Sequence, residues 1–511
     1  MSLDEPIVHG RHVPGGFDEH CDVVVVGSGA GGMTAAMHLA EAGLSVIVLE
    51  EGPYYRRRDY QRFTPSESLR RLFREGGMLA AIGVGQTPMI SLTLGRAVGG
   101  SSLLTGGVCF RIPGEVHRTW ERDLGLADMS ERALESAYRD VEQRLAVTEV
   151  PLALRSGSTN KFVEGAERMG VSMHSMRRNT GSDCEGNARC NFGCPADAKR
   201  AVDKSYMPSA LDHGARILSD ALVERVLVKG ARAVGVTGRL LGGRYGAPSH
   251  RFRVFANAVV VACGTIHTPL LLMRSGLRSR DVGRHITLHP AARMVARFRD
   301  VLRGWDGALQ SVYCDAFYDD GIWLNGVYTA VNVLAAGFPG AGPELGERVR
   351  AMAHYAVFGA MVHDAPGGHV MPAPLGREPL LLYRMEPRDL MRLRRGIRLL
   401  AEMALEAGAE EVLPPIFGYE PVRSRADLDA LEQTPLDARR IECMAFHPLG
   451  SARMANDARR GVVDEEGQCW ELPGLYVMDG SVLPTSIGVN SQVPIMTVAT
   501  QLAWGLRDRL G

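Results

Sequence analysis

The sequence lacks the long apolar runs and the charge excess that mark membrane and nucleic-acid-binding proteins. Its longest uncharged stretch, residues 76–95, is interrupted by glycines, Gln86 and Pro88, so it lacks the sustained apolarity of a spanning helix. We expect a buried, glycine-rich segment there that leads into a cofactor loop. Acidic and basic residues balance at 58 each, which leaves no electrostatic footprint for nucleic acid or an anionic membrane. The prediction is a protein with no membrane span and no nucleic-acid partner.

A secretion signal and a disulfide framework are also missing. The first 22 residues do not show the basic and then apolar order of a signal peptide. The nine cysteines are scattered and odd in number, which argues against a set of disulfides and favours a reducing compartment. We therefore expect a cytoplasmic location.

What is present is typical of a globular enzyme. Hydrophobic residues make up 45% of the chain and charged residues 23%. At 511 residues the chain exceeds what one hydrophobic core usually supports, so we expect two closely joined domains.

The N-terminal region has the pattern of a dinucleotide-binding unit. Four consecutive valines in residues 21–29 predict a strand buried on both faces of a parallel sheet, and small and apolar residues at helical spacing follow. Residues 45–52 predict a second buried strand, which completes a strand–helix–strand unit.

A glycine fingerprint lies between the first strand and the helix. Gly27 permits a tight turn, Gly29 lets the backbone approach a pyrophosphate, and Gly32 allows close packing of helix and strand. The pyrophosphate then lies at a helix N-terminus, where free N–H groups favour anions. Glu50 ends the second strand at the distance that ribose binding requires. The fingerprint predicts a dinucleotide but does not choose FAD over NAD.

Later segments indicate where the rest of the fold lies. Residues 216–262 alternate β-branched segments with glycine-rich turns, as expected of strands in the cofactor domain. From about residue 299 to 440 the pattern changes to short alternating strands, such as residues 323–333, and a long amphipathic helix over 387–409. This region predicts an antiparallel sheet covered by helices.

Residues 95–107, GRAVGGSSLLTGG, resemble the glycine–serine loop of the glucose–methanol–choline (GMC) oxidoreductases. In that family the loop lies along the flavin and the pyrophosphate, and its N–H groups and hydroxyls suit an anionic cofactor. The resemblance implies FAD. Some members attach the flavin through a His in this loop, where this chain has Leu104, so we predict dissociable FAD. The loop residues implied to contact the cofactor are Arg96, Gly99, Gly100, Ser101, Ser102 and Thr105, the last standing where the family usually has Asn.

Two further stretches extend the resemblance. Residues 257–276 are similar to the family's second signature, a strand entering a helix beside the cofactor, and residues 472–500 are similar to its C-terminal flavin-binding segment. The likeness implies a helix whose N-terminus points at the flavin N1–C2=O edge, where hydride transfer leaves negative charge. The cofactor contacts implied outside the loop are Val223, Gly264, Asp479, Gly480, Asn490, Ser491 and Gln492.

The resemblance also implies a catalytic pair. Alcohol oxidation by a flavin needs a base for the hydroxyl proton, a task that suits a neutral imidazole. In GMC enzymes a His opens the motif matched here by HPLGSARM, at His447, and a His or Asn follows about forty residues later. Here Asn490 follows after 43 residues, to hold the substrate oxygen or to cap the following helix. The sequence HPLG followed later by GVN is most similar to bacterial cholesterol oxidases and long-chain-alcohol-oxidase-like members of the family.

Other histidines and the clustered cysteines leave alternatives open. We expect His289 to order a loop, whereas His363 and Asp364 either line the pocket or are exposed. Cys184, Cys190 and Cys194 have the spacing C-x5-C-x3-C, found in some family dehydrogenases that carry an iron–sulfur cluster. Three ligands fall short of a four-ligand metal site, so a buried loop near the flavin is the favoured interpretation.

Together these patterns predict an α/β fold with a Rossmann-type FAD-binding domain and an antiparallel-sheet substrate domain. The cofactor domain is assembled from residues 1–112, 180–298 and 440–511, and the substrate domain from residues 113–179 and 299–439. The expected enzyme is an FAD-dependent GMC alcohol oxidase or dehydrogenase that acts on a bulky hydrophobic or cyclic alcohol, with O2 or another redox acceptor. The alternatives are a same-fold lyase or decarboxylase and a flavin-binding electron-transfer subunit.

Overall fold

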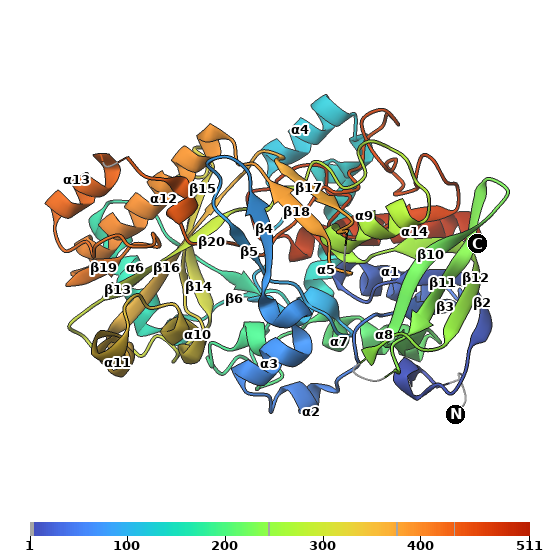
Figure 1. The fold of residues 1–511 in the computed structure, drawn as a ribbon, viewed down its shortest axis with the longest axis horizontal. Helices are drawn as coiled ribbons and strands as arrows, with labels where there is room; N and C mark the ends of the chain where they lie inside the picture. Colours follow the sequence, from blue (N-terminus) through green and yellow to red (C-terminus); the bar gives the residue numbers. More distant parts are fainter. Residues whose placement is uncertain (1–4, 244–245, 375–376, 434) are drawn as a thin grey trace.

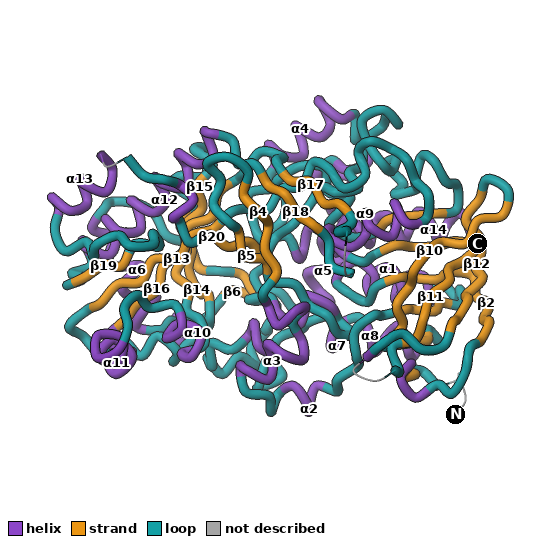
Figure 2. Tube along the Cα trace, viewed as in Figure 1, coloured by secondary structure: helices purple, strands orange, loops and turns teal. Residues whose placement is uncertain are grey.

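The computed structural model describes residues 5–243, 246–374, 377–433 and 435–511. Two sheets lie side by side along the long axis of the molecule, each with helices packed against it (Figures 1 and 2). Within the described residues no helix combines the length and the apolarity needed to cross a membrane.

The first sheet has parallel strands at its centre and confirms the α/β prediction. The four valines at the end of β2 are at most 4% exposed, as expected of a strand covered on both faces. Strand β12 pairs in parallel with β2 and β21, while β10, β11 and β12 form an antiparallel meander. In sheet order the strands are β1 (Ile7–His9), β9 (Arg216–Ser219), β3 (Val46–Leu49), β2 (Phe17–Val26), β12 (Arg251–Val261), β11 (Arg232–Leu240) and β10 (Ala221–Lys229), with β21 (Leu475–Val477) beside β12.

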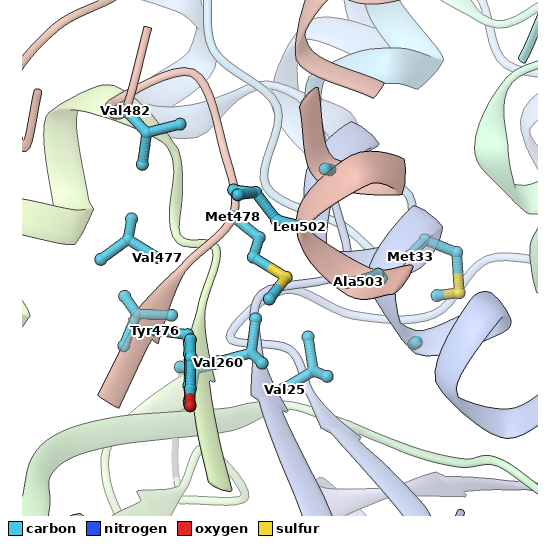
Figure 3. Close-up of a cluster of buried hydrophobic side chains, with 14 of the residues drawn as sticks. Val25, Met33, Val260, Tyr476, Val477, Met478, Val482, Leu502 and Ala503 are labelled. Carbon is cyan, nitrogen blue, oxygen red and sulfur yellow. The ribbon is translucent and has the colours of Figure 1, made fainter. Parts of the chain in front are cut away.

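Helices from both ends of the chain pack on this sheet. The first and last helices contact each other, and the last one also contacts α5. Figure 3 shows part of the shared core, where Val25 and Val260 from two strands lie near Met33, Met478 and Leu502. Burying each such side chain contributes roughly 1.5–3 kcal/mol. The helices are α1 (Ala30–Glu41), α5 (Glu131–Arg144), α7 (Val202–Ser205), α8 (Met207–Asp212), α9 (Gly264–Arg274) and α14 (Gln492–Leu510).

The second sheet is mostly antiparallel, with parallel pairing where β18 meets β4 and β20 meets β5. Helices α6 (Gly157–Arg168) and α12 (Pro387–Glu406) pack against it, and α12 confirms the predicted amphipathic helix. The order is β17 (Gly368–Met371), β18 (Leu380–Tyr383), β4 (Leu79–Gly83), β5 (Ile90–Leu92), β20 (Cys443–Ala445), β13 (Ala291–Arg297), β16 (Tyr355–Val362), β15 (Ile322–Val327), β14 (Gln310–Cys314) and β7 (His174–Ser175), with β19 (Glu411–Leu413) beside β13.

Two local expectations were wrong in part. Residues 76–95 are buried on one face only: in the β4–β5 hairpin Ala81 and Ile90 are 0% exposed, whereas Met89 is 65% exposed and Met78, just before β4, is 85% exposed. Apolar composition alone does not say which face of a strand meets the core. The expected strand pattern over residues 323–333 stops at the end of β15, and Val331–Ala336 form the short helix α10.

The predicted domain boundaries do not coincide with the two sheets. Strands β4, β5, β13 and β20 come from segments assigned to the cofactor domain, yet they pair in the second sheet. Helix α5 comes from a segment assigned to the substrate domain, yet it packs on α14. Which sheet a strand joins is decided by pairing between segments distant in sequence. The division of the chain into a cofactor domain and a substrate domain stays a prediction.

Candidate active site

The fingerprint glycines form a cradle at the start of α1. A Cβ atom at Gly27, whose φ is +101°, would lie 2.3 Å from the carbonyl oxygen of Ala262. At Gly32 it would lie 2.0 Å from the carbonyl oxygen of Gly27. At Gly29, the N-cap of α1, it would meet nothing within 4 Å, so this face of the turn is open. This is the geometry that a pyrophosphate at a helix N-terminus requires.

Glu50 joins the fingerprint turn to the glycine–serine loop. Its buried carboxylate accepts from the amide N of Ser28 (3.0 Å), from Ser28 Oγ (2.6 Å) and from the amide N of Gly52 (2.7 Å). Ser28 Oγ in turn accepts from the amide N of Gly99 at 3.0 Å. Burial raises the pKa of Glu50, and these hydrogen bonds oppose the rise. The two predicted cofactor loops are therefore in contact, and a Cβ at Gly100 would lie 2.8 Å from Gly29 Cα.

Two buried cations hold the back of the glycine–serine loop. Lys199 Nζ donates to the carbonyl oxygens of Leu103 (2.7 Å) and Thr105 (3.0 Å). Arg178, 1% exposed, donates from Nε (3.0 Å) and Nη2 (2.7 Å) to the carbonyl oxygen of Gly106. Burial lowers the pKa of Lys199 to about 8. Sequence reasoning missed both residues, because a cation seventy or more positions away gives no local signal for its carbonyl partners.

The remaining loop residues bond mainly within the loop and to neighbouring elements. Ser101 Oγ accepts from the amide N of Gly95 (2.9 Å), and Ser102 Oγ donates to the carbonyl oxygen of Gly99 (2.7 Å). Arg96 Nε lies 3.3 Å from Glu51 Oε1. Leu104, at the position of the family's flavin-linking His, is buried.

Thr105 connects the loop to the last helix. Its hydroxyl donates to Gln492 Oε1 at 2.8 Å, so the glycine–serine loop and the N-terminus of α14 lie together. The helix begins at Gln492, and Ser491 is its N-cap without a side-chain capping bond. Asn490 therefore does not cap the helix, and its amide is engaged elsewhere.

Asp479 links the second signature to the C-terminal segment. Its carboxylate accepts from the amide N of Gly264 (2.8 Å), Thr268 Oγ1 (2.6 Å) and the amide N of Ser481 (2.7 Å). Burial raises the pKa of Asp479. The same segments meet again at residue 480, where a Cβ would contact Ile495, Thr265 and Leu449. Of the other predicted contacts, Val223 is a buried residue of β10 and Gly480 is buried beside α9 and α14.

His447 and Asn490 meet although 43 residues separate them. Asn490 Nδ2 lies 3.1 Å from His447 Nε2, and the Nδ1 atom of His447 is buried without a partner among the described residues. Burial lowers the pKa of His447 to about 4, so its imidazole is neutral at ordinary pH. Strand β20, which lies between β5 and β13, ends two residues before His447 and thereby places it just beyond the end of that strand.

A second buried histidine holds the segment that precedes Asn490. His289 Nε2 accepts from the amide N atoms of Ile487 (3.1 Å) and Gly488 (3.3 Å). Its ring lies 5.4 Å from the ring of His447, and burial holds the pKa of His289 well below its usual value. The geometry agrees with the expectation that His289 orders a loop.

His363 and Asp364 are not exposed, which removes one of their two expected placements. Asp364 is 3% exposed and accepts from the amide N atoms of Leu288 (2.8 Å) and His289 (3.1 Å), and Tyr383 also donates to it. His363 Nε2 lies 3.2 Å from the carbonyl oxygen of Ser486. Both residues support the walls of the site.

Tyr318, in the connection between β14 and β15 of the second sheet, lines the segment that precedes Asn490, and other aromatic rings pack behind it. Tyr318 Oη donates to the carbonyl oxygen of Ile487 at 3.3 Å. Trp323 stacks on Tyr313 at 4.6 Å and lies edge-on to Tyr318 at 6.3 Å. Phe446, beside His447, is 48% exposed.

The clustered cysteines do not assemble a metal site in the part of the chain that the structure describes. Within these residues no group of three or more His, Cys, Asp or Glu side chains could hold a metal ion. Cys190 Sγ instead accepts from Arg178 Nη2 at 2.8 Å. Cys190 is buried, whereas Cys184 and Cys194 are half-buried, and the choice between a loop near the flavin and an iron–sulfur cluster stays a prediction.

Fold and site together define an FAD-binding α/β oxidoreductase. An FAD-binding-domain model matches residues 22–58, and models described as GMC oxidoreductase match residues 69–291 and 378–499. The chain belongs to the GMC oxidoreductase family and is an FAD-dependent enzyme of that family. The residues present fit FAD. The turn at Gly29 leaves room beside its backbone for a pyrophosphate, and the glycine–serine loop lies next to this turn at Gly100.

Several relatives cover nearly the whole chain. An uncharacterized GMC-type oxidoreductase of Mycobacterium tuberculosis (strain CDC 1551 / Oshkosh) is 36% identical over 485 residues, covering 94% of this chain and 75% of the relative. A long-chain-alcohol oxidase of Arabidopsis thaliana is 30% identical, covering 100% of this chain and 70% of the relative. The similarity therefore extends over nearly all of this chain and about three quarters of these relatives.

Solved structures agree with the fold. An Aspergillus oryzae formate oxidase has a TM-score of 0.74 at 17% identity, covering 97% of this chain and 99% of the other. A pyridoxine 4-oxidase from Mesorbium loti has a TM-score of 0.73 at 19% identity, covering 95% and 99%. At such identities the likeness establishes the fold alone.

Proposed function

We propose that the protein oxidises an alcohol to a carbonyl compound, with His447 as the base and Asn490 orienting the substrate oxygen. The observation that carries the proposal is the 3.1 Å approach of Asn490 Nδ2 to His447 Nε2. The two residues come from distant segments that both adjoin the predicted cofactor loops. Bound FAD supplies a hydride acceptor at flavin N5.

The two side chains have complementary roles. A substrate hydroxyl that replaces this direct contact between them accepts from Asn490 Nδ2 and gives its proton to His447 Nε2. The imidazole can take this proton because burial keeps it neutral, with a pKa of about 4. As the proton leaves the oxygen, the hydride on the carbon that bears the hydroxyl becomes easier to transfer. Asn490 contributes a fixed donor at the oxygen, which limits the number of productive orientations.

The supporting shell explains how this geometry is maintained. His289 fixes residues 487 and 488, and Asp364 fixes the backbone of His289. Thr105 fixes Gln492 just after the pair. Asn490 is therefore held on both sides by side chains that bind neighbouring positions.

We propose a bulky hydrophobic or cyclic alcohol as the substrate. Phe446 presents an exposed ring beside His447, and Tyr318 lines the segment before Asn490 with the buried ring of Trp323 packed edge-on against it. Strand β5 pairs with β20 and so brings the exposed apolar hairpin next to the strand that leads to His447. The Arabidopsis relative named as a long-chain-alcohol oxidase supports the same class.

The test is anaerobic screening of the holoenzyme for bleaching of the flavin. Long-chain and cyclic alcohols should bleach it, and free sugars should not. Admission of air then separates O2 from other acceptors by the rate at which the colour returns. If no alcohol bleaches the flavin, the proposal fails and a lyase or decarboxylase of the same fold takes its place.

We also propose that FAD is bound without a covalent link, because Leu104 stands at the position of the linking histidine and its side chain cannot form that bond. Acid precipitation should release all the flavin into the supernatant. Flavin that stays with the precipitated protein would contradict this.

A further inference from the structure

A cavity that neither His447 nor Asn490 lines lies where α2 (Arg57–Tyr60) approaches β1 and α8 (Figure 1). Its volume is about 580 Å3, within the range of small-molecule sites. None of the predicted cofactor or catalytic residues lines it. The lining consists of Ile7, Tyr54, Tyr55, Arg56, Arg57, Arg58, Asp203, Met207, Pro208, Leu211 and Asp212.

A carboxylate with an unused acceptor lies in this cavity. Asp203 is 5% exposed, and its Oδ2 accepts from Tyr60 Oη at 2.6 Å. Its Oδ1 is buried and has no hydrogen-bond partner among the described residues. An unsatisfied buried acceptor costs free energy, so a ligand that brings an N–H donor would be stabilised there.

Three consecutive arginines form the rim. Arg57 pairs with Asp197 at 3.6 Å. Arg56 and Arg58 are exposed, and neither forms an ion pair with a carboxylate in the described ranges. Their guanidinium groups are suited to a phosphate, which accepts several N–H bonds from such planar donors.

The rest of the cavity lining, between Asp203 at its floor and the arginines at its rim, is aromatic and apolar. Tyr54 and Tyr55 precede α2, and Met207 and Leu211 belong to α8. Such walls suit a flat ring. We propose that this cavity binds a nucleoside monophosphate, with an N–H edge of the base at Asp203 Oδ1 and the phosphate between Arg56 and Arg58.

Guanine is the base that we assign, because its N1–H and N2–H groups are neighbouring donors, either of which can bond to Asp203 Oδ1 while Oδ2 keeps its bond from Tyr60. The cavity is also connected to the cofactor loop: the amide N of Val202, next to Asp203, donates to Ser102 Oγ at 3.2 Å. Binding there leaves the FAD cradle free, since no residue of the fingerprint turn contributes to the lining.

The test uses the FAD-loaded enzyme and calorimetric titration with GMP, guanosine and ribose 5-phosphate. GMP should bind saturably at one site per chain without changing the flavin content, and more tightly than either fragment. Arg56→Ala with Arg58→Ala should weaken GMP about tenfold or more and leave guanosine unchanged. Asp203→Asn should weaken GMP and guanosine by a similar factor and leave ribose 5-phosphate unchanged.

Arg62→Ala is the matched control, because Arg62 is an exposed arginine nearby that does not line the cavity. It should bind GMP like the unmodified protein.

Absence of saturable GMP binding at millimolar concentration overturns the proposal. Equal affinity for GMP and ribose 5-phosphate also overturns it, because it would show a site for anions only. The arginine variants lie on the surface, so they keep the test decisive if Asp203→Asn does not fold. Flavin bleaching by alcohols is measured without nucleotide, so failure of either proposal leaves the other testable.

Discussion

The two sheets contribute to the active site in different ways. The first sheet ends in the open turn at Gly27 and Gly29, and its acidic group, Glu50, bonds mainly to main-chain N–H groups and to Ser28, which in turn accepts from Gly99 of the glycine–serine loop. The second sheet offers side chains instead, such as those of Tyr318 and Trp323. Backbone recognition serves a cofactor that stays the same, whereas exchangeable side chains can select a substrate. Changes in the first sheet should therefore alter flavin binding, and changes in the second should alter substrate kinetics.

The strongest test lies at the junction of the two sheets. His447→Ala removes the base, and we expect the anaerobic rate of flavin reduction to fall by about 10²–10⁴-fold while FAD stays bound. Stopped-flow absorbance with a bleaching alcohol measures this rate. His213→Ala, a change at an exposed histidine on the first-sheet side, should reduce normally. A near-normal rate in His447→Ala would show that another group removes the proton.

The second test concerns the end of β3. Glu50→Ala leaves the N–H groups of Ser28 and Gly52 without their acceptor, at a cost of about 1–3 kcal/mol for each buried donor. We expect FAD to bind at least about tenfold more weakly, measured by flavin content after dialysis. Glu442→Ala, which removes a carboxylate paired with Arg293 near the second sheet, should keep its FAD. Equal loss of FAD in both variants would show that flavin binding does not depend mainly on the first sheet.

The third test is the pH profile of flavin reduction. Since the pKa of His447 is lowered to about 4, the neutral base is present at neutral pH and is lost only as the pH falls towards that value. The reduction rate should stay flat from pH 8 to about pH 6 and then drop by about tenfold per unit once the pH is below the pKa. A midpoint near the ordinary histidine value of about 6.5 would contradict the burial of this ring.

The smallest expected effect comes from the second sheet. Tyr318→Phe removes the hydrogen bond to the carbonyl oxygen of Ile487, worth about 0.5–1.5 kcal/mol. We expect kcat/KM to fall by about 2- to 10-fold with unchanged flavin content. Loss of flavin in this variant would place Tyr318 with the cofactor rather than with the substrate.

Local sequence patterns predicted much of the first sheet and of the predicted cofactor-binding turn. The valine run of β2, the glycines after it and the strand–helix order of β12 and α9 are confirmed, because each depends on neighbours within a few residues. Residues 76–95 were predicted to be buried and form a hairpin that is buried on one face only, since apolar composition does not reveal which face of a strand meets the core. The hydrogen bonds of Lys199 and Arg178 to the glycine–serine loop were not predicted, because their carbonyl partners lie more than seventy positions away.

The sequence by itself determined the class of fold, the cofactor cradle at Gly27–Gly32 and the family resemblance, because turn geometry and strand burial are encoded locally. Only the tertiary structure decided that Asn490 contacts His447 rather than capping α14, that His289 holds the intervening loop, and that Asp203 keeps an unused acceptor. These facts depend on how distant segments pack, and that packing is set by the sum of many buried contacts rather than by any one motif.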